Sequence, residues 1–551
     1  MADLRVIGLR AEAPEKGSSG KRWTHVIFRR RLLVIVLLLI QVLFITVLIA
    51  AGTGPRFRYL NWLLHILSVA VSFYILNKKE KSGYKLTWIF LIILFPIFGG
   101  ILYVMFSTLS NPRKLRRLME KENRFFRPFF NLSENVLPAL IKEQEDCVPQ
   151  VRYLQEYSGY PVYRHTRTEY FPSGEAFFTR LLPELEKAEQ YIFMEFFILR
   201  QGKMLDPIIS IMAKKAARGL DVRLIYDDLG CFMSLPSDYK QYLESLGIKC
   251  TVFNPFKPIW SSHQNNRDHR KIISIDGKVA FTGGMNLADE YINVYEKYGH
   301  WKDAGIMLEG EAAWSLTLIF LHMWNLERKN QSRKADHKVR RAAKAEDADS
   351  FVNDIESFYP WKQEPCPVPS EGYIQPYADS PIDDENVGEH VYIQIINNAK
   401  HYVYINTPYL VVDDNLLSAL TLAAKSGIDV RIITPHRWDK WMVRITSRSY
   451  YRQLVLAGVK VYEYSEGFNH SKTFVSDDKT ATVGTTNLDF RSLYLHFECG
   501  VWVYKNSAVQ AVKEDFLQTI PQCHRVTLKD CARNAFQGLI QDVLRLFAPL
   551  M

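Results

Sequence analysis

The sequence predicts an α/β protein made of two pseudo-symmetric domains packed face to face, preceded by a transmembrane helical region. Three observations lead to this prediction. The chain after about residue 158 repeats itself in order. Within each repeat, short apolar segments typical of strands alternate with helix-like segments, which is typical of α/β units with a buried sheet. Long apolar runs near the N-terminus have the length of membrane spans.

The N-terminal part divides into a basic segment, residues 1–31, and a predicted membrane region, residues 32–106. Residues 32–51 are apolar except for Gln41 and Thr46, and about twenty such residues are needed to cross a hydrocarbon core as a helix. This run is too long for the apolar core of a signal peptide, and more apolar segments follow. The other two predicted spans are residues 60–76 and 86–106.

Basic residues flank every predicted membrane end, so the positive-inside rule gives conflicting signs for the topology. The seven cysteines are scattered and have neither CxxC nor Cys/His ligand spacing, which indicates free thiols and no structural zinc. We therefore expect a multi-pass protein of the cell membrane with a cytoplasmic catalytic region. The net charge of +10 favours a polyanionic partner, either nucleic acid or an anionic lipid surface.

The internal repeat sets the domain limits. The strand-like segment at 191–199 parallels 402–410, and Gly-x-Asp-Val-Arg recurs at 219–223 and 427–431, where glycine ends a helix and a strand begins. Residues 328–344 carry eight Lys or Arg, which suits a solvated insertion and also leaves a lipid-headgroup role open. The predicted parts are a connector (107–157), a first domain (158–327), a charged insertion and linker (328–370) and a second domain (371–551).

Each half carries one copy of a His-x-Lys-x4-Asp motif. The first copy is His269, Lys271 and Asp276, and the second is His470, Lys472 and Asp477. Residues two apart in a strand share a face, so each histidine and its lysine can address one phosphate. The spacing downstream also matches, because a glycine and an asparagine follow each histidine by 14 and 17 residues; these are Gly283, Asn286, Gly484 and Asn487.

These residue types suit phosphoryl transfer without a metal. A neutral imidazole is a nucleophile, and lysine and asparagine stabilise negative oxygens as charge develops. One histidine would attack while the other protonates the leaving alcohol and later deprotonates the incoming one. Asp303 and Glu498 hold matching places in the two halves and are the predicted orienting acceptors. For Asp276 and Asp477, although they belong to the motif, we expect a structural, hydrogen-bonding role at strand ends.

These motifs resemble the phospholipase D superfamily, and more closely its bacterial cardiolipin synthase branch. The paired motif carries the resemblance to the superfamily, and segments 95–103, 170–175, 265–271, 283–291 and 299–303 carry the resemblance to the branch. The resemblance implies two phospholipase-D-type domains and transfer of a phosphatidyl group between two phosphatidylglycerol molecules, giving cardiolipin and glycerol. It implies no metal or organic cofactor, and it makes His269 the nucleophile and His470 the acid/base. The segment at 32–51 is an extra span relative to that family.

Two alternative functions use the same motif pair. A phospholipase D-type hydrolase would transfer the phosphatidyl group to water, and a phosphodiesterase acting on nucleic acid would also explain the basic charge. The predicted membrane spans favour phosphatidylglycerol and anionic membrane lipid as partners, and we expect no nucleic acid.

Overall fold

The computed structural model describes residues 55–95, 99–104, 112–133, 135–143, 145–255, 265–334 and 351–550, together with Leu39, Leu43 and Thr46. The basic segment 1–31 lies outside the described residues, as does the predicted span 32–51 apart from those three positions. Residues 335–350 of the charged insertion and linker also lie outside them.

The first half contains a seven-stranded sheet in the order β1-β9-β7-β6-β2-β3-β4. The strands β2, β3 and β4 are parallel, and the other neighbours are antiparallel. The strands are β1 (Thr166–Phe171), β2 (Tyr191–Phe196), β3 (Asp221–Asp227), β4 (Lys249–Phe253), β6 (Ile272–Ile275), β7 (Val279–Gly283) and β9 (Gly305–Gly310). The helices are α8 (Gly174–Lys187), α9 (Leu205–Ala217), α10 (Asp228–Cys231), α11 (Tyr239–Ser245) and α12 (Glu311–Lys334).

The second half repeats this strand order as β10-β19-β17-β16-β11-β13-β14, with β20 added at the edge. The predicted α/β repeat is therefore confirmed. The strands are β10 (Tyr373–Asp379), β11 (Tyr402–Asn406), β13 (Asp429–Pro435), β14 (Lys460–Tyr464), β16 (Thr473–Ser476), β17 (Thr480–Gly484), β19 (His496–Tyr504) and β20 (Cys523–Arg525). The helices are α14 (Val387–Asn398), α15 (Asp414–Lys425), α16 (Trp441–Leu456), α17 (Phe490–Tyr494), α18 (Ser507–Thr519) and α19 (Ala535–Phe547).

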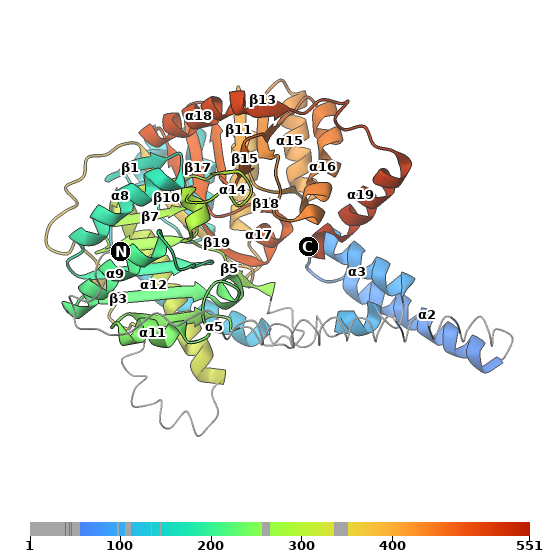
Figure 1. Cartoon of the computed structure of the whole chain (residues 1–551), viewed down its shortest axis with the longest axis horizontal. Helices are drawn as coiled ribbons and strands as arrows, with labels where there is room; N and C mark the ends of the chain where they lie inside the picture. Colours follow the sequence, from blue (N-terminus) through green and yellow to red (C-terminus); the bar gives the residue numbers. More distant parts are fainter. Residues whose placement is uncertain are drawn as a thin grey trace.

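Short strands join the two halves by crossing between them. Strand β5 (Arg267–Asp268) pairs in parallel with β19 of the second half. Strand β15 (Gly467–Asn469) pairs in parallel with β8 (His300–Lys302) of the first half. One hydrophobic core also contains residues of both halves, including Phe193 of β2, Trp314 of α12 and Val501 of β19. Each half therefore completes the other, and Figure 1 shows them side by side.

The predicted connector, residues 107–157, is largely helical in its described residues. Helix α5 (Pro112–Phe130) is followed by α6 (Leu137–Glu143) and α7 (Val148–Arg152). In α5, Leu118, Phe126 and Phe130 are buried in the core shared by the two halves. They lie four or eight residues apart, so they form one face of a helix. Basic residues lie between these apolar positions in the sequence, so the apolar face is not seen as a continuous run.

The N-terminal part of the described chain contains α2 (Pro55–Leu76) and α3 (Ser82–Leu94), and residues 99–104 are also helical. Lys81, just before α3, donates to Glu389 at 2.6 Å, and Glu389 is buried in the second half. The Thr87 hydroxyl donates to the Leu546 carbonyl at 2.7 Å, so α3 lies against α19, as Figure 1 shows. Within the described residues, no helix has both the length and the apolarity needed to cross a bilayer.

Candidate active site

His269 follows β5 and is held by strand β19 of the other half. Its backbone N–H donates to the Phe497 carbonyl at 2.9 Å. Its Nδ1 lies 2.9 and 3.0 Å from the two carboxylate oxygens of Glu498. Because Nδ1 is occupied in this way, Nε2 is the nitrogen left for chemistry.

His470 follows β15 and has the same arrangement with the halves exchanged. Its backbone N–H donates to the Lys302 carbonyl at 2.6 Å, and its Nδ1 lies 2.7 Å from Oδ2 of Asp303. Each histidine is therefore paired with the carboxylate of the opposite half. The two predicted orienting residues lie where they can orient the imidazoles, but the pairing is crossed, and the sequence had not predicted this.

Both motif lysines are buried beside their histidines. Lys271 and Lys472 are each 2% exposed, and each Nζ donates to the carbonyl oxygen of the histidine two residues before it. Neither lysine forms an ion pair with a carboxylate in the part of the chain that the structure describes. Burial lowers the pKa of Lys271 to about 8 and that of Lys472 to about 7. Both lysines therefore lie close to their pKa near pH 7, and an anionic ligand beside them would favour their charged form.

The electrostatics of the two histidine pairs differ. Burial, then the nearby Lys271, lowers the pKa of His269 well below its ordinary value. Burial and Lys472 lower the pKa of His470 to about 4, while the Asp303 charge opposes that shift. Burial raises the pKa of Glu498 to about 8, whereas His470 and Lys472 hold the pKa of Asp303 below its ordinary value against the effect of burial. Both imidazoles are therefore neutral near pH 7, and His470 is the one that accepts a proton more readily.

The two carboxylates are held by residues that the sequence analysis missed. The hydroxyls of Thr485 and Ser492 donate to Glu498 at 2.5 and 2.7 Å. Asp303 accepts from the Trp301 indole at 3.3 Å and from the Ala304 N–H at 2.9 Å. Thr485 immediately follows Gly484 of the matched spacing, and that position was the available signal.

The matched glycines and asparagines lie at the ends of β7 and β17. A Cβ on Gly283 would lie 2.5 Å from the Ala304 carbonyl oxygen, and one on Gly484 would lie 2.6 Å from that of Cys499, so both glycines permit a close approach of strands. The Asn286 side chain accepts from the Ile198 N–H and donates to the Tyr291 hydroxyl, so it supports the site rather than facing a ligand freely. The buried Oδ1 of Asn487 has no hydrogen-bond partner among the described residues.

Asp276 and Asp477 are not brought to the histidines. Each lies at a turn after the motif strand with positive φ, 52° and 54°. The Asp276 carboxylate accepts from three successive backbone N–H groups at 2.8 Å, and Asp477 accepts three at 2.6 to 2.9 Å. At about 3.3 Å per residue, five residues of extended chain place each aspartate some 17 Å from its lysine. These contacts are those of the structural, hydrogen-bonding role that we expected for the two aspartates from their place at strand ends.

His496 is a third histidine at the site that the sequence analysis did not single out. Its side chain is 10% exposed, its ring centroid lies 5.5 Å from that of His269, and its Nδ1 lies 3.8 Å from Glu498. Neither ring nitrogen has a hydrogen-bond partner among the described residues. His269, His496 and Glu498 also form a grouping with metal-ligand chemistry, their ligand atoms within 4.8 Å of one another, but a metal there would displace the His269–Glu498 hydrogen bond.

Comparisons with known proteins identify the family of the two domains. The family model "Cardiolipin synthase, PLD-like domain" matches residues 181–313 and 392–520, and "Phospholipase_D-nuclease N-terminal" matches residues 66–107. A solved structure, the phosphatidylserine synthase of Haemophilus influenzae, is similar in fold, with a TM-score of 0.51 and 14% identity, covering 72% of this chain and 97% of that one.

Relatives in sequence cover nearly the whole chain. The cardiolipin synthase of Geobacillus sp. strain WCH70 is 32% identical over 90% of this chain and 95% of its own length. That of Halalkalibacterium halodurans is 32% identical over 89% and 93%. A protein of Streptococcus mutans described as uncharacterized is 40% identical over 87% and 99%. The chain belongs to the cardiolipin synthase family, whose members are phosphatidyltransferases with phospholipase-D-like domains.

Proposed function

We propose that this enzyme transfers a phosphatidyl group from one phosphatidylglycerol to a glycerol hydroxyl of a second, forming cardiolipin and releasing glycerol through a phosphohistidine. The observation that carries the proposal is the crossed pairing of His269 with Glu498 and of His470 with Asp303. It gives two imidazoles with fixed Nδ1 partners and free Nε2 atoms, beside two buried lysines that suit one phosphate.

In the first step, Nε2 of His269 attacks the phosphorus of phosphatidylglycerol. The bond from phosphorus to the glycerol oxygen breaks, and that oxygen takes the Nε2 proton of a protonated His470, the form that the bound phosphate anion favours, so glycerol leaves as a neutral alcohol and His470 becomes neutral. In the second step, the glycerol hydroxyl of another phosphatidylglycerol gives its proton to His470 and attacks the phosphohistidine. The nitrogen–phosphorus bond then breaks, and His269 returns to its neutral form.

The contrast between the two pairs supports His269 as nucleophile and His470 as acid and base. The pKa of His470 is lowered only to about 4 because the Asp303 charge opposes burial. The pKa of His269 is lowered further, and burial raises the pKa of its partner Glu498 to about 8, so that partner carries less negative charge near pH 7. An imidazolium is therefore stabilised better at His470.

Lys271 and Lys472 would balance the charge on the phosphoryl oxygens. His496 would donate to or accept from the phosphate or the incoming glycerol, because a buried imidazole without a hydrogen-bond partner costs about 1–3 kcal/mol. Its counterpart in the first half is Trp301, two residues before Asp303, whose indole donates to that carboxylate. The position beside His470 that matches His496 therefore carries an indole, which does not titrate.

We further propose that residues 32–106 hold the enzyme in the cell membrane as a multi-pass region, with the catalytic domains (158–327 and 371–551) in the cytoplasm. The support is a large exposed apolar surface on α2 and α3, which soluble monomers rarely show. Trp62, Ile66, Phe73 and Ile93 are 56–68% exposed. Phosphatidylglycerol and anionic membrane lipid are then the partners, and the net charge of +10 suits them.

A lipid product assay tests the proposed function. Purified enzyme in micelles with phosphatidylglycerol as the only lipid should release one glycerol for each four-chain lipid formed. Phosphatidic acid as the sole lipid product would instead show a hydrolase. Cleavage of an oligonucleotide with no glycerol release would show a nucleic-acid phosphodiesterase. His269→Ala and His470→Ala should each abolish turnover, because the two steps are sequential.

A further inference from the structure

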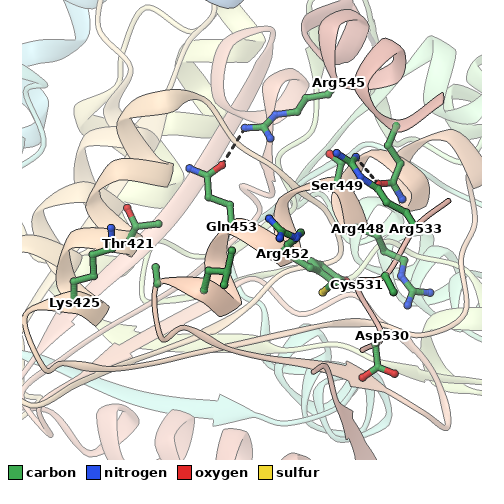
Figure 2. Close-up of a pocket in the computed structure, with 15 residues that line it drawn as sticks. Thr421, Lys425, Arg448, Ser449, Arg452, Gln453, Asp530, Cys531, Arg533 and Arg545 are labelled. Carbon is green, nitrogen blue, oxygen red and sulfur yellow. Dashed lines mark hydrogen bonds between the residues drawn. The ribbon is translucent and has the colours of Figure 1, made fainter. Parts of the chain in front are cut away.

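A basic cavity lies away from the histidines, between α15, α16 and the C-terminal segment that contains α19. Its volume is about 400 Å³. Figure 2 shows the side chains that line it, which include Lys425 of α15, Arg452 of α16 and Arg545 of α19. Neither the catalytic mechanism nor the internal repeat accounts for this cavity.

The cavity has an excess of positive charge. Five of its lining residues are basic and one, Asp530, is acidic; the basic residues are Lys425, Arg448, Arg452, Arg533 and Arg545. Arg533 pairs with Asp542 at 3.0 Å and Arg448 lies 3.7 Å from Glu463. The other three form no ion pair with a carboxylate among the described residues. Guanidinium groups gathered around a cavity suit a phosphate, whose oxygens accept paired N–H bonds.

Helix α19 carries an exposed apolar face beside this cavity. Phe536, Leu539 and Val543 are 70%, 61% and 45% exposed, and their spacing puts them on one side of the helix. Gln541 and Arg545, which line the cavity, lie on the opposite side at 100° per residue. This is the pattern of a helix lying in a membrane interface, with its apolar face in the acyl chains and its polar face at headgroup level.

The apolar face of α19 also continues into the N-terminal helices. The Phe547 and Phe90 rings lie 6.2 Å apart, and Ile93 and Leu94 of α3 are more than half exposed. Figure 1 shows α19 next to α3. A bilayer that contacts α3 would therefore contact α19 as well.

We propose that α19 docks on an anionic bilayer and that the cavity binds the phosphate of an anionic phospholipid headgroup, at a site separate from the catalytic histidines. The proposal rests on the membrane attachment proposed above, because it needs the chain to lie on a bilayer. The lipid held there is not the reacting one, since no catalytic residue lines the cavity. The cavity thus provides a second, non-reacting contact with the charged membrane surface.

Cys531 lines the cavity and is partly exposed, so the rate at which its thiol is modified can report whether the cavity is occupied. The full-length enzyme in nanodiscs is treated with N-ethylmaleimide, and modification of each cysteine is followed by mass spectrometry. Relative to phosphatidylcholine alone, 30% phosphatidylglycerol should slow modification of Cys531 at least threefold. Cys366, partly exposed and remote from the cavity, is the internal reference and should react equally in both. The same protection in phosphatidylcholine nanodiscs with added inorganic phosphate would overturn the lipid assignment.

Variants test the two parts of the surface. Lys425→Glu combined with Arg452→Glu should remove the protection, whereas Arg218→Glu, an exposed cation of the first half, should keep it. Leu539→Asp should also remove it, and Met233→Asp, which is equally exposed elsewhere, should not. Unchanged protection in the cavity variant, with Cys366 reacting normally, would overturn the proposal. Glycerol release by the wild-type enzyme in the same nanodiscs reports the proposed function separately, so the two can fail independently.

Discussion

The crossed pairs, His269 with Glu498 and His470 with Asp303, predict that mutations in one pair affect the same chemical step although its two residues belong to different domains. A substrate that leaves without a proton separates the two steps. With the glycerol of phosphatidylglycerol replaced by p-nitrophenol, the first step releases a phenolate and needs no general acid. His470→Ala should then still give a burst of one p-nitrophenol per enzyme, because His269 can attack. His269→Ala should give no burst.

The magnitude of the effect follows from the carboxylates. Asp303 is fully buried and lies 2.7 Å from His470, and a hydrogen bond to a charged group contributes about 1.5–3 kcal/mol. At about 1.4 kcal/mol per decade, Asp303→Asn should slow transfer from phosphatidylglycerol roughly 10- to 150-fold. It should leave the p-nitrophenol burst unchanged. Glu498→Gln should slow both reactions, because Glu498 orients the attacking ring.

The assay is stopped-flow absorbance for the burst and radiolabelled glycerol release for transfer, with Glu514→Gln as an exposed control. If Asp303→Asn lost the burst and Glu498→Gln kept it, each carboxylate would serve the histidine of its own half, and the crossed arrangement would not operate in catalysis. A burst in His269→Ala that is absent from His470→Ala would exchange the two histidine roles.

Three further predictions concern stability and pH. Asp276→Ala should lower the free energy of unfolding by about 2–4 kcal/mol, because the Asp276 carboxylate accepts hydrogen bonds from three backbone N–H groups. The control Asp238→Ala, at an exposed position, should not lower it. Thermal melts in micelles compare the two variants, and equal melting temperatures would contradict the structural role. Lys271 and Lys472 lose their charge as pH rises through their pKa values of about 8 and 7, so kcat/KM for phosphatidylglycerol should fall above about pH 7. The value of kcat should fall only at higher pH, because bound phosphate stabilises the charged lysines. A kcat/KM that stays constant from about pH 6 to 9 would refute this. Lys81→Met leaves the buried Glu389 without its ion-pair partner and should lower the free energy of unfolding by about 3 kcal/mol. Adding Glu389→Gln should restore most of the melting temperature. An unchanged melting temperature in the single variant would show that this ion pair does not hold the N-terminal helices.

Sequence reasoning found the features that recur along the chain. Two strands that begin at Tyr191 and Tyr402, and two motifs with matched glycines, are local patterns, and the structure has the α/β repeat that they predicted. The crossed pairing was not predictable in this way, because it depends on β5 meeting β19 and β15 meeting β8 across more than 150 residues. Thr485, Ser492 and His496 lie 13, 6 and 2 residues from Glu498 and were missed for a different reason: their roles come from side-chain contacts with that carboxylate, which the repeat alone does not reveal.

The crossing also explains why each imidazole is oriented only when both halves are assembled. His269 finds its acceptor only on β19, and His470 finds its acceptor only just after β8, so neither half alone contains an oriented imidazole. The lysines also link the two halves electrostatically, because the charge of Lys271 in the first half lowers the pKa of His470 and Lys472 in the second. The two buried lysine charges repel each other, as the effect of Lys271 on the pKa of Lys472 indicates, and an anion between them would offset that repulsion. Binding of the substrate phosphate would therefore reduce the repulsion between Lys271 of the first domain and Lys472 of the second. This phosphate belongs to the group that we propose is transferred.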